Sequence, residues 1–193
     1  MKTFYEDVWA ELPEDPEPWA WERRRALVLS EARAGERVLD LGCGAGRFVA
    51  ALRDAGADPV GVELADAALE RARRNVPGAD LRAMTDEIPL EDSTVDLVWC
   101  SEVLEHVPDT AGLLSEVRRV LKTGGRLLAT TPAPRRLVAL LRWDEHFDPL
   151  GQHVRFYSRR SLTRTLETFA FEGVEVSSTR GMLVARARKA RLV

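Results

Sequence analysis

Three glycines between two acidic residues form the part of this sequence with the clearest capacity for chemistry. Asp40 lies in an apolar run, and Gly42, Gly44 and Gly46 follow it at alternate positions. Glycine permits a sharp backbone turn and lets a ligand approach the main chain closely. The G-x-G-x-G spacing differs from the G-x-G-x-x-G spacing of pyrophosphate-binding turns. An acid beside this shorter turn suits a ligand that carries a positively charged amine.

A second acid, Glu63, ends an apolar run that begins at Pro59. In a strand–helix–strand unit, an acid at this place lies beside the ribose of a bound nucleoside, where a carboxylate can accept hydrogen bonds from both ribose hydroxyls. A solvated strand end is the alternative interpretation of Glu63. Asp40 and the glycine turn precede Glu63 at the spacing of such a unit, which favours the ribose-binding role.

The elements that must position these residues alternate between strand and helix patterns. Strands are predicted over residues 37–41, 59–63, 80–83, 95–100 and 125–131, and helices over 46–55, 65–75 and 110–121. This alternation predicts a parallel sheet with helices on both faces. Such sheets bind ligands at the carboxyl ends of their strands, where the glycine turn and Glu63 fall.

The two ends of the chain depart from this alternation. The first 34 residues predict two helices separated by a proline-rich break. The residues after Pro132 predict a helix over 135–142, a loop with aromatic and histidine residues, and a helix over 158–170. Two further strands, 173–178 and 182–187, are expected to form an antiparallel hairpin at one edge of the sheet.

Length and composition agree with one globular domain. The chain has 193 residues, of which 45% are hydrophobic and 31% charged, with a formal net charge of −3. We find no run of membrane-spanning length and no signal-peptide pattern. Two cysteines, Cys43 and Cys100, are too few for a disulfide framework, so a cytoplasmic location is predicted. Basic residues predominate after about residue 118. This excess favours an anionic acceptor; the alternative interpretation is that the arginines are scattered over solvated faces.

Five motifs in order resemble the class I S-adenosylmethionine-dependent methyltransferases, in particular their type-11 and type-12 groups. They are Val38–Gly46 (VLDLGCGAG), Gly61–Leu64 (GVEL), Ile88–Leu90 with Val95–Val98, Ser101–Asp109 (SEVLEHVPD) and Leu121–Leu128 (LKTGGRLL). The resemblance implies an α/β fold with a Rossmann-like, doubly wound, seven-stranded sheet of order 3-2-1-4-5-7-6, in which strand 7 is antiparallel and helices cover both faces. It also implies S-adenosyl-L-methionine as cofactor and S-adenosyl-L-homocysteine as product.

The same resemblance implies a role for individual residues in holding the cofactor. The glycine turn would pass under the methionine moiety with Asp40 near its ammonium group, Glu63 would hold the ribose hydroxyls, and Leu64 would pack on the adenine. The implied cofactor-binding residues are Asp40, Gly42, Cys43, Gly44, Gly46, Glu63, Leu64, Thr85, Asp86, Cys100 and Val103. One position departs from the family, because Met84 stands where an acid is usual. Asp86 would then contact the adenine amino group, or Thr85 and backbone groups would suffice.

Methyl transfer from a sulfonium needs alignment of the reacting atoms and exclusion of water. A phenol or carboxylic acid acceptor also benefits from a base, and His106 is the candidate for that catalytic role. A structural histidine at a helix start is the alternative. By resemblance, the segment after residue 132 covers the acceptor, so His146, His153, Arg155 and Tyr157 are candidate substrate-binding residues for an anionic or aromatic acceptor. A packed lid without chemistry is the alternative there.

Other chemistries lack their motifs. Asp144, His146, Asp148 and His153 are of metal-ligand type, but their spacing is generic and no metal site is predicted. Cys100 lacks the adjacent proline of cytosine-C5 methyltransferases, and residues 100–103 lack the Asn/Asp-Pro-Pro-aromatic motif of amino-directed nucleic-acid methyltransferases. The chain shows no basic, aromatic-interleaved RNA-binding appendage.

Together these patterns predict a methyltransferase that acts on a small-molecule acceptor at oxygen, with no nucleic-acid partner and no transmembrane segment. Methylation of RNA or protein, and a non-catalytic cofactor-binding regulatory or scaffold role, are the alternatives. We expect a single domain over residues 1–193, divided into an N-terminal helical cap (1–34), a cofactor-binding core (35–131), a lid or acceptor segment (132–170) and a C-terminal β-hairpin (171–193). The sequence leaves the acceptor and the oligomeric state open.

Overall fold

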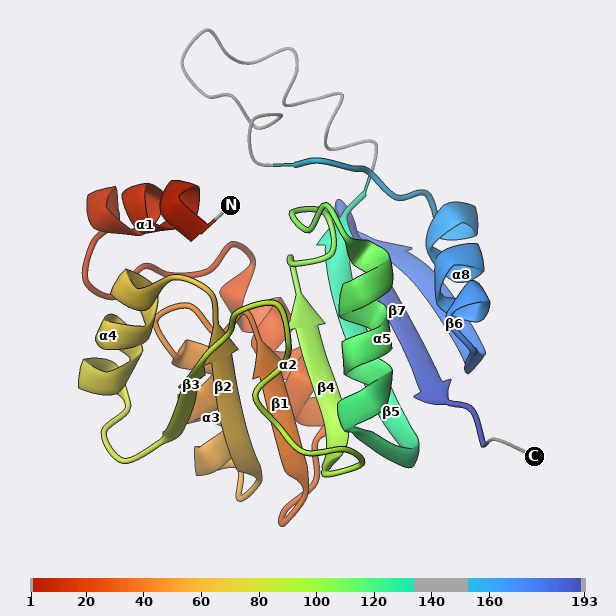
Figure 1. The fold of residues 1–193 in the computed structure, drawn as a ribbon, viewed down its shortest axis with the longest axis horizontal. Coiled ribbons are helices and arrows are strands. Elements are labelled where there is room, and N and C mark those ends of the chain that lie inside the picture. The colour runs from red at the N-terminus through yellow and green to blue at the C-terminus, as the bar shows by residue number, and fades with distance from the viewer. Residues whose placement is uncertain (1, 134–152, 192–193) are drawn as a thin grey trace, which may run out of the picture.

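The computed structural model describes residues 2–133 and 153–191, and its strands form one seven-stranded sheet (Figure 1). The strands are β1 (Arg37–Leu41), β2 (Asp58–Glu63), β3 (Asp80–Ala83), β4 (Val95–Ser101), β5 (Leu121–Pro132), β6 (Phe171–Thr179) and β7 (Met182–Lys189). Their order is β3-β2-β1-β4-β5-β7-β6. Strand β7 pairs antiparallel with β5 and β6, and the other neighbouring strands pair in parallel. The predicted fold class and strand order are confirmed.

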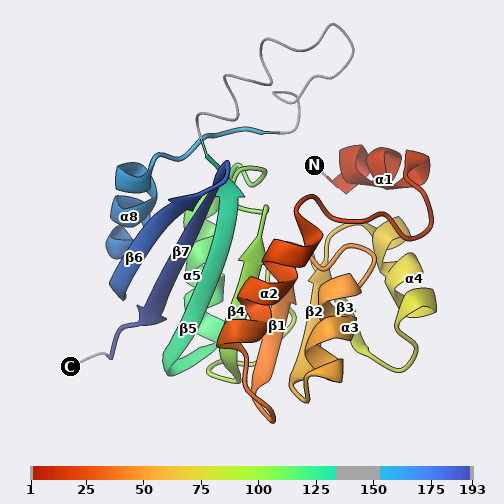
Figure 2. The ribbon, with the colours of Figure 1, turned by 180° about the vertical axis from the view of Figure 1, so that it is seen from behind.

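Helices cover both faces of this sheet. They are α1 (Lys2–Glu11), α2 (Trp21–Glu31), α3 (Arg47–Asp54), α4 (Asp66–Asn75), α5 (Thr110–Val120) and α8 (Arg159–Thr168). Helices α5 and α8 lie on one face, and α2 and α3 lie on the other, as the two opposite views show (Figures 1 and 2). In these described ranges no helix has the length and apolar character needed to cross a membrane.

Alternate side chains of the central strands supply two cores, one on each face. In β1, Val38 packs with residues of α2 and α3, whereas Leu39 packs with those of α5 and α8. In β4, Trp99 and Val98 divide in the same way. Because successive side chains of a strand point to opposite faces, this period of two buries the sheet on both sides. The rigid sheet then fixes the positions of the loops at its carboxyl edge.

Helix α1 lies above that carboxyl edge, beside the start of α4 (Figure 1). The Glu6 carboxylate accepts hydrogen bonds from the backbone amides of Asp66 (2.6 Å) and Ala67 (3.0 Å), so it caps the N-terminus of α4. The Lys2 ammonium group also lies 2.7 Å from the Asp66 carboxylate. None of the residues of α1 is buried. Polar contacts of the Glu6 and Lys2 side chains with the start of α4 therefore help to hold the helix above the sheet.

Most predicted element boundaries lie within two residues of those observed, and the largest difference is at the start of β5. The Thr-Gly-Gly sequence predicted a turn before a strand at 125, but β5 begins at Leu121, which pairs with Val95. Gly124 has φ of +74° and the register shifts nearby, so the strand continues through a bulge instead of starting after a turn. The predicted helix over 135–142 and the candidate residue His146 lie outside the described residues.

Candidate active site

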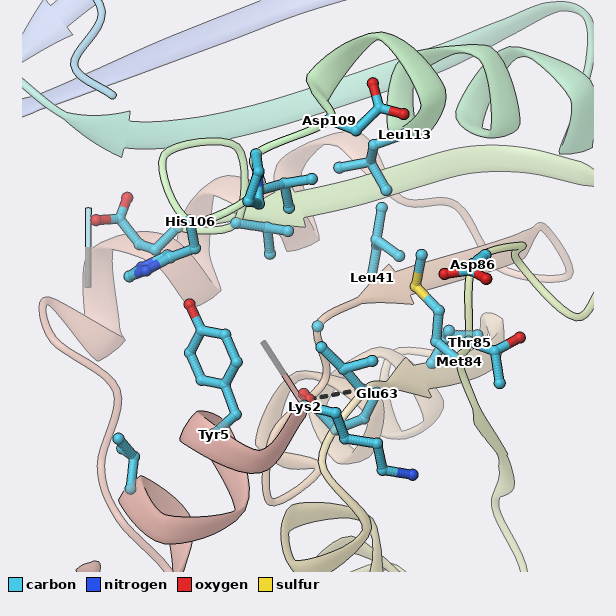
Figure 3. A pocket seen from close by; sticks show the side chains of 18 of the residues that line it. Lys2, Tyr5, Leu41, Glu63, Met84, Thr85, Asp86, His106, Asp109 and Leu113 are labelled. Atoms are coloured by element: carbon cyan, nitrogen blue, oxygen red, sulfur yellow. Dashed lines mark hydrogen bonds between the residues drawn. The ribbon is translucent and has the colours of Figure 1, made fainter. Parts of the chain in front are cut away.

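A cavity of about 890 Å³ lies at the carboxyl edge of the sheet, between α1 and the loops that follow β1, β2, β3 and β4 (Figure 3). Its volume is in the range of small-molecule and cofactor sites. The wall includes the predicted residues Gly42, Glu63, Leu64, Thr85, Asp86, Val103 and His106. It also includes Met84, at the position where the family has an acid. The structure therefore brings together most of the candidate cofactor residues and the candidate base.

The turn after β1 requires glycine at its three alternate positions. Gly42, Gly44 and Gly46 have φ of +77°, +53° and +87°, a region that other residues rarely adopt. A Cβ atom on Gly42 would lie 2.7 Å from a Val103 methyl group, and one on Gly44 would lie 3.0 Å from the Trp9 ring. Glycine is thus required for both conformation and close approach. The result is an exposed stretch of main chain at Gly42 in the cavity wall.

Glu63, the last residue of β2, ties this turn to the neighbouring strand. One carboxylate oxygen accepts from the Gly44 amide (2.9 Å), and the other accepts from the amides of Leu64 (2.7 Å) and Ala65 (3.1 Å). Burial raises the pKa of Glu63, and these three amides oppose that effect. A carboxylate has about four acceptor positions, so about one stays available for a ligand hydroxyl.

Asp40 is a buried carboxylate inside β1, two residues before Gly42. Its side chain is almost fully buried, and its Oδ2 atom has no hydrogen-bond partner among the described residues. Burial raises the pKa of Asp40 to about 7, the nearby Arg24 guanidinium lowers it, and the Glu63 carboxylate raises it. A buried carboxylate with one unpartnered oxygen, two residues before the glycine turn, fits a ligand with a positively charged amine, as the methionine moiety of S-adenosylmethionine has.

Arg24 on α2 is a site residue that the sequence analysis missed. Its Nε atom donates to the Ser101 hydroxyl (2.7 Å), a terminal nitrogen donates to the Ser101 carbonyl (3.2 Å), and the other donates to the Trp19 carbonyl (3.1 Å). The guanidinium also lies 5.2 Å from the centre of the Phe48 ring. Three consecutive arginines at 23–25 on one helix were a signal that one of them could face the sheet. Which one is buried depends on how the helix packs.

The loop after β4 carries the candidate base His106 and, directly before it, Glu105. Glu105 is fully buried, and burial together with the Glu102 carboxylate raises its pKa well above the usual range. The His106 ring lies 6.0 Å from the ring of Tyr5 and 4.7 Å from that of His153. The Tyr5 hydroxyl points toward His106 (Figure 3), and burial raises the pKa of Tyr5 to about 12. The Tyr5 hydroxyl and the His106 imidazole thus meet at this end of the cavity, and the His153 imidazole packs against His106.

Asp40, Gly44, Gly46 and His153 are not among the residues that line the cavity, and neither are the remaining described candidates. Cys43 and Cys100 are buried in the cores, and burial raises the pKa values of both thiols. Tyr157 is buried with its hydroxyl 3.5 Å from that of Thr110, and the Arg155 guanidinium donates to the Pro108 carbonyl. The structure does not bring Tyr157 or Arg155 into that wall, although both pack near the loop that carries His106.

Helix α1 supplies a side of the cavity that the motifs gave no reason to expect. Tyr5 and Trp9 line it together with Lys2 and Val8. The aromatic residues of this acidic N-terminal segment were the only available signal, and the sequence analysis assigned them to a helical cap without a role in the site. Their contribution depends on the Glu6 contact with α4, which joins segments far apart in the sequence.

Comparison with known proteins finds a consistent set of relatives. A family model described as a methyltransferase domain matches residues 15–176. A probable S-adenosylmethionine-dependent methyltransferase of Mycolicibacterium smegmatis is 35% identical over 156 residues, which cover 79% of this chain and 59% of that protein. The 27-O-demethylrifamycin SV methyltransferase of Amycolatopsis mediterranei is 36% identical over a gapped alignment of 182 positions, which covers 75% of this chain and 66% of that protein.

A solved structure supports the fold independently of sequence. The S-adenosylmethionine-dependent methyltransferase of Mesorhizobium loti superposes with a TM-score of 0.68 over 87% of this chain and 96% of its own, at 23% identity. The chain spans about three fifths of the length of the Mycolicibacterium relative.

Proposed function

The chain belongs to the S-adenosylmethionine-dependent methyltransferases, and from this premise we propose that it methylates a small-molecule acceptor at oxygen. The observation that carries the proposal is the position of His106 in the wall of the cavity that also contains Gly42 and Glu63. A basic side chain in that wall suits an acceptor that must lose a proton, such as a phenol or a carboxylic acid. The Amycolatopsis relative is named for a substrate that lacks a methyl group on oxygen.

The residues of the site divide between binding the cofactor and preparing the acceptor. When bound, S-adenosylmethionine supplies a methyl group that is already strongly electrophilic. Asp40 and the glycine turn would hold its methionine moiety, and Glu63 would accept a hydrogen bond from its ribose. Leu64 and Met84 would pack against its adenine. Helix α1 covers the cavity and would limit the access of water to it.

His106 would act on the acceptor in this proposal. Its imidazole would take the proton of the acceptor hydroxyl as the oxygen attacks the methyl carbon and the carbon–sulfur bond breaks, and it would then release that proton to solvent. Tyr5 would help to orient the imidazole, because its hydroxyl points toward it (Figure 3).

His106→Ala tests this role. We expect turnover with labelled cofactor and a panel of phenols and carboxylic acids to fall by about 10²–10⁴-fold, with unchanged cofactor affinity in calorimetry. Equal turnover in the variant and the unchanged protein would show that His106 is not the base. Loss of the cooperative thermal transition in the variant would instead support a structural histidine.

The acceptor class needs a separate measurement. If RNA were the acceptor, binding would weaken steeply with added salt, because phosphate contacts release counterions. Cofactor binding without labelling of any hydroxyl acceptor or extract component would favour a regulatory or scaffold role and contradict the proposal.

A further inference from the structure

Glu105, His106 and His153 bring three potential metal ligands together from two separate loops. A carboxylate oxygen and one nitrogen from each imidazole all lie within 4.8 Å of one another. The Glu105 Oε1 atom is 3.8 Å from the His106 Nε2 atom. His106 lines the cavity, so this cluster reaches the place where the acceptor is proposed to bind.

The cluster contains buried polar atoms without partners. Glu105 is 1% exposed, and within the described residues its carboxylate has no more than a weak contact with the Thr131 hydroxyl and its own main chain. The Nδ1 atom of His153 is also buried and has no hydrogen-bond partner within the described residues. Buried polar atoms in folded proteins are nearly always satisfied, and exceptions often mark the place of an ion or water. Several such atoms in one cluster therefore indicate a missing ligand.

Main-chain hydrogen bonds hold the two loops in this arrangement. The Glu105 carbonyl accepts from the amides of Val154 (2.9 Å) and Arg155 (3.3 Å), the two residues that follow His153. The Arg155 guanidinium also donates to the Pro108 carbonyl, beyond His106 in the same loop. His153 is thus fixed beside Glu105 by contacts that do not use its own side chain, which leaves the imidazole available.

We propose that Glu105, His106 and His153 bind a divalent metal ion of the Zn²⁺ type. Two imidazole nitrogens and one carboxylate oxygen are a usual ligand set for catalytic zinc and for related transition metals. Ligand atoms at about 2.0–2.2 Å from zinc lie roughly 3.4 Å apart in a tetrahedron. The distances between the three ligand atoms must therefore shorten by about 1 Å when the metal binds.

Three protein ligands leave at least one coordination position for a substrate atom. Resting on the proposed function, we assign that position to the acceptor hydroxyl. The metal would lower the pKa of this hydroxyl, whose proton would leave to solvent. The oxygen would attack the methyl carbon as the carbon–sulfur bond breaks, and S-adenosylhomocysteine would leave with the bonding electron pair on sulfur. His106 would then be a metal ligand. The metal would replace the direct proton uptake by His106 that is proposed above, whereas methylation of the acceptor at oxygen stays the same.

The test uses the full chain, first treated with a chelator and then titrated with Zn²⁺ in calorimetry, with metal analysis after dialysis. We expect one zinc per chain and an increase in thermal stability on binding. Glu105→Gln and His153→Ala should each weaken zinc binding by at least tenfold. Glu167→Gln changes an exposed carboxylate of α8 and serves as the matched control, with unchanged zinc affinity. Mg²⁺ and Mn²⁺ are titrated in parallel to define the preference.

Substoichiometric zinc binding to the unchanged chain would overturn the metal site, as would stoichiometric binding that survives in both ligand variants. Cofactor affinity measured without metal shows separately whether the variants keep the methyl-donor site intact. If zinc binds as expected but chelation leaves turnover unchanged, the assignment of the acceptor hydroxyl to the metal is wrong, whereas the proposed function stands. If zinc binds and no acceptor is ever labelled, the proposed function fails and the metal site stands.

Discussion

The ionisation of Asp40 is expected to control cofactor affinity near neutral pH. Burial raises the pKa of this carboxyl from 3.8 to about 7, with Arg24 acting in the opposite direction. The ammonium group of the cofactor binds the ionised carboxylate and not the neutral acid. Binding should therefore strengthen as the pH rises through 7, and complex formation below pH 7 should release a proton from Asp40.

The magnitude follows from the size of the pKa change. About three pKa units correspond to an ionisation cost of about 4 kcal/mol in the free protein. With a pKa of about 7, Asp40 is about nine-tenths ionised at pH 8 and about one-tenth ionised at pH 6, so affinity should fall about tenfold between them. The neutral acid is favoured in the folded state, so this group lowers the free energy of unfolding as the pH rises from about 4 to about 7.

Calorimetric titration of the cofactor into the unchanged chain and into Asp40→Asn measures this effect at pH 6, 7 and 8. The ratio of the two affinities removes the titration of the cofactor's own amino group, because both proteins bind the same ligand. We expect the ratio to fall about tenfold from pH 8 to pH 6, and buffers of different ionisation enthalpy should report the released proton. A ratio that is constant over this range would show that the ionisation of Asp40 does not control cofactor affinity.

Three further substitutions test other parts of the site. Glu63→Ala should weaken cofactor binding by about 1–3 kcal/mol in calorimetry, since it removes a charged acceptor that also holds the glycine turn; equal affinity would remove Glu63 from the site. Gly42→Ala should weaken cofactor binding, because the added Cβ meets Val103 at the cavity wall. A variant that loses thermal stability but keeps its cofactor affinity would contradict this. Arg24→Leu should lower the free energy of unfolding by about 3–5 kcal/mol in urea denaturation, because it removes the donor to Ser101 and the cation near Asp40, Glu102 and Glu105, and a loss below 1 kcal/mol would count against that role.

The sheet was largely predictable from the sequence because its signals are local. Apolar runs of strand length alternate with amphipathic helix patterns, and the order of strands follows from the family motifs. The bulge at Gly124 was not predictable, because the pairing of Leu121 with Val95 decides it and a Thr-Gly-Gly sequence is equally suited to a turn.

The candidate site was predictable only where a motif marks a residue. Gly42, Glu63 and His106 lie in motifs, and all three line the cavity. Arg24 and Tyr5 reach the site through the packing of α2 and α1, which no local pattern specifies. The approach of His153 to Glu105 likewise depends on pairing between distant loops, so the grouping of potential metal ligands could not be found from spacing along the chain.

The way in which α1 is attached has a consequence for the exchange of ligands. This helix covers the cavity, yet it buries none of its residues fully and is held by the polar contacts of Glu6 and Lys2 with the start of α4. Separating these groups transfers charged atoms back to water. The side chains of Tyr5, Val8 and Trp9 that would leave the cavity wall belong to neither core, so α1 can lift without disturbing the packing of the sheet. Entry of the methyl donor and departure of its product should then be fast relative to any opening of the sheet, and both rates should increase with ionic strength.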